Sequence, residues 1–156
     1  MIKKTPQKQK RNNQICPRKT LLEQLYDKGW LEYRSSPYNS GARLKAGLDL
    51  IFNYQILKRA NLHSGYIFNT KIDNSSSLES KMYMDSLNFY RQCLRAVPAE
   101  FWQVVRQVCL DEKLPSFNPN ISERQQSYNN YIFRIDLCRG LDRIILSQLK
   151  IEKERK

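Results

Sequence analysis

Apolar residues recur every three to four positions along five stretches of the chain, which is the spacing of one face of an α-helix. The first stretch follows Thr20 and Glu23, which are spaced as a capping box, and it ends at Gly29. A helix of about nine residues is too short to be stable alone. We therefore expect Leu25 and Trp30 to pack against the rest of the protein.

Two longer helices are predicted on either side of a polar segment. Residues 41–60 predict a core helix with an apolar face of Leu44, Leu48, Ile51, Phe52 and Ile56. The next helix opens at a Ser-Ser-Leu-Glu capping box (residues 76–79) and runs to about Arg95, with a face of Met82 or Tyr83, Leu87, Tyr90 and Leu94. Residues 61–77 predict a loop, with a short extended piece at 66–68.

Prolines mark the limits of the fourth helix. Pro98 suits its first position and Pro115 follows its end, while its apolar face consists of Phe101, Val104, Val105 and Val108, with Trp102 and Cys109 beside them. The last helix starts between Ser122 and Asn130 and carries Ile132, Ile135, Cys138, Leu141, Ile145 and Leu149. No convincing strand is present, so the pattern predicts an all-α fold, a compact bundle of about five helices.

Composition divides the 156 residues into an arm, one domain and a tail. A hydrophobic content of 40% suffices for a core in residues 20–150. Residues 1–19 contain seven cations and no acid, namely Lys3, Lys4, Lys8, Lys10, Arg11, Arg18 and Lys19. We expect this arm to be disordered until it meets a polyanion, although it would equally serve as a solubilising tail. The charged residues 151–156 are expected to fray.

The chain lacks the features of a secreted or membrane-spanning protein. Its basic start is not followed by the apolar segment of a signal peptide, and the apolar residues 48–52 fall far short of the roughly 20 that a span needs. The cysteines, Cys16, Cys93, Cys109 and Cys138, form no CxxC pair, which favours buried thiols in a reducing compartment. We therefore expect a cytoplasmic protein with no integral membrane association.

The sequence predicts no catalytic, metal or cofactor site. Such sites need a base beside a nucleophile, or three to four ligands, whereas the chain has a single histidine, His63. No glycine-rich phosphate-binding motif occurs. Asp136 and Asp142 each stand three residues from Arg139 and are interpreted as its surface ion-pair partners.

The excess of positive charge indicates an anionic partner. Lysine and arginine number 27 against 15 acids, a formal net charge of +12. In the last helix, Arg134, Arg139, Arg143 and Lys150 leave the apolar stripe and are suited to contact phosphates or base edges. Together with the seven arm cations they form the candidate nucleic-acid site. The competing interpretation is the solvated face of a core helix.

Four segments of the chain, LLEQLYDKGWL, SGARLKAGLDLI, LRAVPAEFWQVVRQVCLDEKL and DLCRGLDRIILSQL, resemble a poorly characterised group of small alphaproteobacterial and phage-related proteins. The C-terminal part of that family looks like a sigma-factor-type helix-turn-helix. The resemblance implies such a C-terminal half, with Arg139 and Arg143 near nucleic acid. It implies core positions at Ala42, Leu44, Val105, Val108, Cys109, Leu137, Leu141 and Ile144. Where the family has a short Gly-Trp-Pro turn, this chain has SFNPNISERQQSYNN.

The expected function is therefore that of a nucleic-acid-binding regulator, with DNA favoured over RNA, that acts by stoichiometric binding without turnover. A protein partner or a homodimer stays open. The main alternative is a protein-interaction module, an adaptor or effector, with an aromatic patch drawn from Trp30, Tyr33, Tyr38, Trp102 and Tyr128. A second alternative is attachment of the basic arm to anionic lipid.

Overall fold

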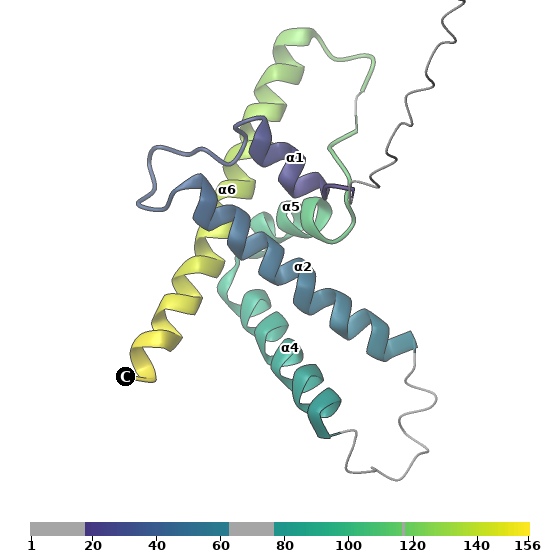
Figure 1. The fold of residues 1–156 in the computed structure, drawn as a ribbon. Helices are drawn as coiled ribbons and strands as arrows, with labels where there is room; N and C mark the ends of the chain where they lie inside the picture. Colours follow the sequence, from purple (N-terminus) through teal and green to yellow (C-terminus); the bar gives the residue numbers. More distant parts are fainter. Residues whose placement is uncertain (1–17, 63–76, 117) are drawn as a thin grey trace, which may run out of the picture.

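The computed structural model describes residues 18–62, 77–116 and 118–156, and within these ranges it is all-helical (Figure 1). Its helices are α1 (Leu21–Asp27), α2 (Ser40–Leu62), α4 (Ser77–Ala96), α5 (Ala99–Cys109) and α6 (Glu123–Glu154). The predicted all-α fold of about five helices is confirmed. The predictions for residues 1–17 and for most of the loop, including Cys16, His63 and the extended piece at 66–68, lie outside the described residues.

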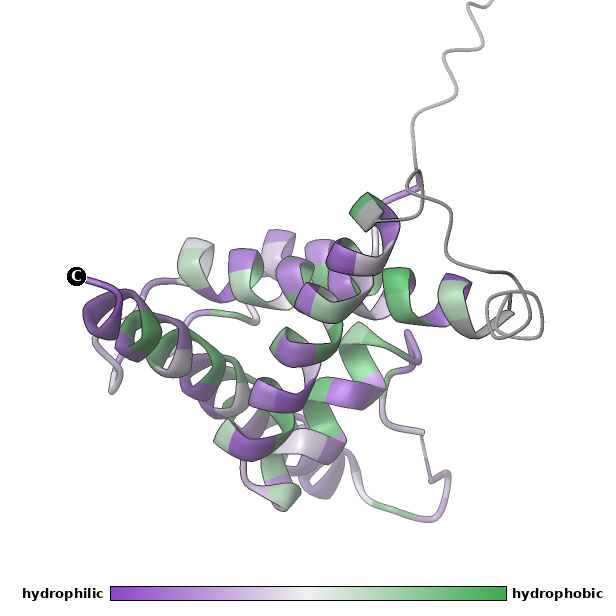
Figure 2. Ribbon diagram, turned by 90° about the horizontal axis from the view of Figure 1, so that it is seen from below, coloured by the Kyte–Doolittle hydropathy of each residue, from purple (hydrophilic) through white to green (hydrophobic). Residues whose placement is uncertain are grey.

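The helices are arranged around α6, which is the longest at 32 residues (Figure 1). α2 crosses the middle of α6, and α1 and α5 pack beside this crossing. α4 runs antiparallel to α2, and the two extend away from α6 as a helical hairpin. Hydrophobic and hydrophilic residues alternate along the helices, as in Figure 2, so the helices carry apolar positions that can be buried where they meet.

The core forms where α1, α2, α5 and α6 meet. Its fully buried members include Leu22, Leu25, Leu50, Val105, Val108, Leu137, Leu141 and Ile144. The predicted core positions in α5 and α6 are therefore confirmed, and Ala42 and Leu44 pack half-buried against the same cluster. The three described cysteines, Cys93, Cys109 and Cys138, are buried free thiols, as expected.

The residues predicted to cap α1 lie at its two ends in the structure. The Thr20 hydroxyl accepts from the Glu23 amide at 3.3 Å, and the Glu23 carboxylate accepts from the Thr20 amide at 2.7 Å, which completes the capping box. Gly29 ends the turn with a φ of 77°, a conformation that favours glycine. Leu25 is buried and Trp30 packs against the core, so the short helix is held by tertiary contacts.

The apolar face of α2 differs from the prediction. Phe52 is 59% exposed, whereas the buried positions of this helix are Arg43, Ala46, Gly47, Leu50 and Leu57. Arg43, Ala46 and Gly47 lie on the side of α2 that meets α6. The buried side of α2 therefore differs from the predicted one, which was drawn from large apolar residues. Gly47 is needed there because a Cβ would collide with a methyl group of Leu22.

The predicted faces of α4 and α6 are wrong at their edges. Met82 and Leu94 of α4, and Ile132 and Leu149 of α6, are exposed. α4 instead buries Ser86 and Cys93, and the buried side of α6 includes Phe133, Leu137 and Gly140. The prediction gave weight to large apolar side chains and so passed over Ser86, Cys93 and Gly140, which lie on the buried sides. A Cβ on Gly140, for example, would collide with Val105 of α5.

The C-terminal half shows no helix-turn-helix geometry that would confirm the resemblance. α5 and α6 are joined by residues 110–122, far longer than the three to four residues of such a turn, and α6 is one uninterrupted helix from its Ser122 cap. α6 also continues to Glu154, through residues that the sequence predicts to fray. Glutamate, lysine and arginine are good helix formers, so the hydrophilic last turns seen in Figure 2 extend the helix into solvent.

Candidate nucleic-acid interface

The candidate interface is built on one side of α6. Arg139, Arg143 and Lys150 are separated by four and seven residues, which places all three on the same side of an α-helix. All three are exposed. Leu146 lies among them, so the side is basic with an apolar residue at its centre. We call these three cations the α6 basic face.

The first of two adjoining hollows lies at the N-terminal end of this basic face. It has a volume of about 360 Å³, is open to solvent, and is lined by Tyr33, Ser35, Ser36, Pro37, Tyr38, Phe101, Arg139, Asp142, Arg143 and Leu146. Its walls thus come from the segment between α1 and α2, from the start of α5 and from α6. Three aromatic rings and two guanidinium groups share one concave surface, which we call the aromatic pocket.

Arg139 stands between two of these rings. Its guanidinium carbon is 6.0 Å from the ring centre of Tyr33 and 6.0 Å from that of Phe101. Its Nη2 donates to the Tyr33 hydroxyl at 3.4 Å, and this hydrogen bond raises the pKa of Arg139 above its ordinary value. Arg139 is therefore permanently charged and its planar group is held loosely over aromatic faces.

The second hollow continues along α6 toward its C-terminus. It has a volume of about 290 Å³ and is lined by Gln92, Arg95, Ala96, Arg143, Leu146, Ser147, Lys150 and Ile151. Arg143 and Leu146 line both hollows, so the two adjoin. Arg95 of α4 adds a fourth cation, and the Gln92 amide fixes α4 to α6 by donating to the Ser147 carbonyl at 3.4 Å.

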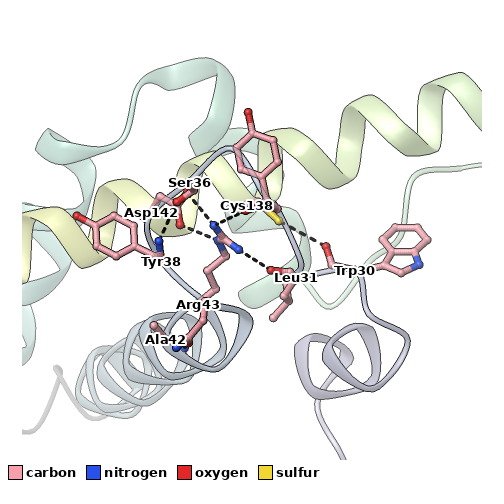
Figure 3. Close-up of polar contacts among 10 residues, drawn as sticks. Trp30, Leu31, Ser36, Tyr38, Ala42, Arg43, Cys138 and Asp142 are labelled. Carbon is pink, nitrogen blue, oxygen red and sulfur yellow. Dashed lines mark hydrogen bonds and ion pairs between the residues drawn. The ribbon is translucent and has the colours of Figure 1, made fainter.

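A buried arginine anchors the wall of the aromatic pocket (Figure 3). Arg43 rises from α2 and is fully buried, and its Nε and Nη2 donate to the two carboxylate oxygens of Asp142 at 2.6 and 3.2 Å. Its Nη1 donates to the Leu31 carbonyl at 2.7 Å and its Nη2 to the Tyr33 carbonyl at 3.4 Å. One side chain thus joins α2, α6 and the segment that carries Tyr33. The predicted pairing of Asp142 with Arg139 is wrong, because the carboxylate is taken by Arg43.

Burial shifts the pKa of two further groups on α6. The Cys138 thiol donates to the Trp30 carbonyl at 3.4 Å, as drawn in Figure 3, and burial raises the pKa of this thiol to about 11. Partial burial raises the pKa of Asp136, and Glu100 contributes to this rise while Arg139 opposes it. Asp136 makes no ion pair within 4.0 Å in the described ranges, so its predicted pairing with Arg139 is also wrong.

The other predicted site residues are placed apart from the basic face. Arg134 lies five residues before Arg139, about 140° around the helix, and its Nη2 donates to the Glu32 carbonyl at 3.1 Å. Lys19 pairs with Asp27 at 2.7 Å, and this hydrogen bond raises the Lys19 pKa, while Arg18 is exposed. The remaining arm cations, Lys3, Lys4, Lys8, Lys10 and Arg11, lie outside the described residues.

Several contributors to the site were not found from the sequence. Arg95 was missed because it belongs to a helix distant in the sequence. Tyr33 was named only as part of a protein-docking patch, because only the fold brings it to Arg139. Arg43 did leave a signal: it falls on the same helical side as Ala46 and Leu50, and an arginine in an apolar stripe calls for an internal acid.

The side chains that line the pocket include groups suited to binding an anion with a planar ring. Arginines supply charge-assisted hydrogen bonds to anions, and the rings supply stacking surfaces. Among the described residues, no three His, Cys, Asp or Glu side chains are grouped so as to hold a metal ion. Neither is any described helix both long and apolar enough to cross a bilayer.

No family model, curated protein or solved structure matches the chain. The resemblance to small alphaproteobacterial and phage-related proteins therefore stays a prediction from the sequence. A functional assignment has to come from the site itself.

Proposed function

We propose that this protein binds nucleic acid, DNA in the first place, and acts as a regulator by stoichiometric binding without turnover. The observation that carries the proposal is the α6 basic face, where Arg139, Arg143 and Lys150 meet Arg95 of α4 over two adjoining hollows. Cations clustered on one face are the electrostatic footprint of a phosphate-binding surface. The seven cations of residues 1–19 add a second, sequence-independent source of attraction.

The regulatory part of the proposal is supported by the resemblance and by the kind of chemistry at the site. Arginine side chains bind anionic groups through charge-assisted hydrogen bonds, which suits stoichiometric binding. A cytoplasmic location belongs to the same proposal. It is supported by the buried free thiols of Cys93, Cys109 and Cys138, which fit a reducing compartment.

Fluorescence anisotropy with labelled DNA and RNA at about 50 and about 200 mM salt tests the proposal. Each phosphate contact changes the affinity about 3.5-fold over this interval. Arg139→Gln with Arg143→Gln removes two such contacts, so the ratio of the affinities at the two salt concentrations should become about 12-fold smaller. The matched control is Lys58→Gln with Arg59→Gln, two exposed cations near the far end of α2. The control removes the same charge and should change affinity much less.

Deletion of residues 1–17 divides the binding between the arm and the α6 basic face. A truncated protein that still binds, and still responds to Arg139→Gln with Arg143→Gln, assigns the contacts to α6. Absence of micromolar binding to every probe at the lower salt would refute the proposal despite the net charge of +12. Equal losses in the α6 and α2 variants would refute the assignment to α6.

A protein-docking role is the second candidate, and one observation favours it. Tyr128 and Tyr131, near the start of α6, are 59% and 58% exposed, and Ile132 beside them is exposed as well. Of the wider aromatic patch predicted from the sequence, Tyr33 and Tyr38 line the aromatic pocket, while Trp30 and Trp102 are partly buried against the core. Binding to a partner through Tyr128 and Tyr131 would be nearly insensitive to salt, which separates it from phosphate binding.

A further inference from the structure

The aromatic pocket is shaped for more than phosphate contacts. A surface that only neutralises phosphates needs exposed cations, whereas here the Arg139 guanidinium lies 6.0 Å from the ring centres of both Tyr33 and Phe101, and all three line a hollow of about 360 Å³. Planar rings and a guanidinium plane are the groups on which unstacked bases stack. The volume lies at the small end of ligand sites, about 300–1,000 Å³, and suits one base rather than a larger ligand.

The placement of charge around the pocket agrees with a nucleotide in this orientation. Arg143 is exposed at the border between the two hollows, where a phosphate following the base would lie. Asp142 also lines the pocket, but both its carboxylate oxygens accept from Arg43, which offsets its repulsion of a phosphate. From Arg139 to Lys150 the basic face extends roughly 16 Å along α6, the length of a few nucleotides.

We propose that the aromatic pocket receives an unpaired base of single-stranded nucleic acid, which stacks on Tyr33, Phe101 and Arg139 while Arg143 binds the adjoining phosphate. This inference rests on the proposed function and names the form of nucleic acid that the site selects. A duplex offers its phosphates to the α6 basic face but keeps its base faces covered. The protein therefore prefers single strands to duplexes with the same number of phosphates.

Tyr33 gives the sharpest test, because its backbone carbonyl accepts from Arg43 at 3.4 Å, and this bond stays when the side chain is changed. The Arg43 guanidinium also lies 5.8 Å from the centre of the Tyr33 ring, so a variant that keeps the ring is needed beside one that removes it. Tyr33→Phe keeps the ring, whereas Tyr33→Leu removes the stacking surface. Tyr128→Leu, far along α6 and outside the pocket, is the matched control. Thermal unfolding of each variant verifies that the fold is retained.

Anisotropy is measured with three DNA probes of equal phosphate number: a non-folding single strand of about twelve nucleotides, a duplex, and an abasic strand with the same backbone. Stacking of one base predicts at least about fivefold tighter binding of the single strand than of the abasic strand. Tyr33→Leu should abolish this difference and leave duplex binding unchanged. Tyr33→Phe and Tyr128→Leu should preserve it.

The outcomes separate this inference from the proposed function. If the single strand, the abasic strand and the duplex bind equally well, or if Tyr33→Leu keeps the preference, the base-stacking pocket is refuted while phosphate binding stands. If none of the probes binds at low salt, the proposed function is refuted and the pocket with it. Loss of the preference in Tyr33→Phe as well would show that the hydroxyl, not the ring, is responsible, and would also overturn the inference.

Discussion

The ion pair between Arg43 and Asp142 offers the most direct test of how the fold holds the site. Removal of the acid by Asp142→Ala should be more destabilising than removal of the arginine. The reason is that Asp142→Ala leaves the guanidinium of Arg43 in the core. The Arg43 side chain is 1% exposed, and that of Asp142 is 15% exposed. The variant thus strands a charge that is fully buried and keeps only the Leu31 and Tyr33 carbonyls as acceptors.

The size of the effect follows from the bonds that are lost. Two charge-assisted hydrogen bonds, at 2.6 and 3.2 Å, disappear, each worth about 1.5–3 kcal/mol. Removal of one partner of a buried pair costs about 3–5 kcal/mol in total. Water entering at the partly exposed position of Asp142 favours the lower end, about 3 kcal/mol. For a protein of this size that corresponds to a Tm lower by about 10 °C.

Urea denaturation and thermal unfolding followed by circular dichroism measure this loss. The control is Asp27→Ala, which breaks the solvent-exposed pair with Lys19 and should lower stability far less than Asp142→Ala. The double variant Arg43→Met with Asp142→Leu removes both charges and should lose clearly less stability than Asp142→Ala, because no uncompensated charge stays buried. A loss below about 1 kcal/mol in Asp142→Ala, or an equal loss in the double variant, would refute the reasoning.

Three further predictions concern packing, capping and ionisation. Gly140→Ala should lower the free energy of unfolding by about 1–3 kcal/mol, because the added methyl group collides with Val105. The control is Gly41→Ala at the exposed start of α2, which should be neutral or slightly stabilising. Equal urea midpoints of the two variants would contradict this. Thr20→Ala should cost about 1 kcal/mol through loss of the α1 cap, and an unchanged midpoint would show that the cap is dispensable. Burial raises the pKa of the Cys109 thiol to about 12, so as the pH rises the unfolded chain loses this proton before the folded protein does. The contribution of this thiol to stability is complete below about pH 9. Between about pH 9 and pH 12 the free energy of unfolding should fall by up to about 1.4 kcal/mol per pH unit. Urea midpoints at rising pH should fall less steeply in Cys109→Ala, and parallel slopes would contradict the assignment to this thiol.

The starts and ends of several helices could be predicted from the sequence because their signals lie in a few neighbouring residues. The capping box at Thr20 depends on a few neighbouring residues and is found where expected. Pro98 marks the start of α5 to within one residue, as its N-cap in place of its first position, and α6 begins after Ser122, at the early end of the predicted range. The apolar stripe of α5 was also correct, since its large side chains coincide with its buried face. These signals mark where a helix begins or ends, whereas the stability of a helix as short as α1 also needs its tertiary contacts.

Helix faces were less predictable because burial depends on the partner helix. α2 is apolar on several sides, so the position of its core face is decided by where Arg43 and Gly47 meet α6 and α1. The same holds for the site. The sequence indicated that Arg139 and Arg143 share a side of α6, but the proximity of Tyr33 requires the turn between α1 and α2 to fold back onto α6.

The ion pair that stabilises the crossing also orders the pocket, and this accounts for a charged pair in place of an apolar one. Two apolar side chains would hold α2 against α6 at equal or lower cost, but they would not bind the carbonyls of Leu31 and Tyr33. The segment before α2 would then lose its fixed position on α6. Arg43→Met with Asp142→Leu should therefore fold while losing the preference for single strands. Retention of that preference in the double variant would mean that Tyr33 is positioned by its own contact with Arg139.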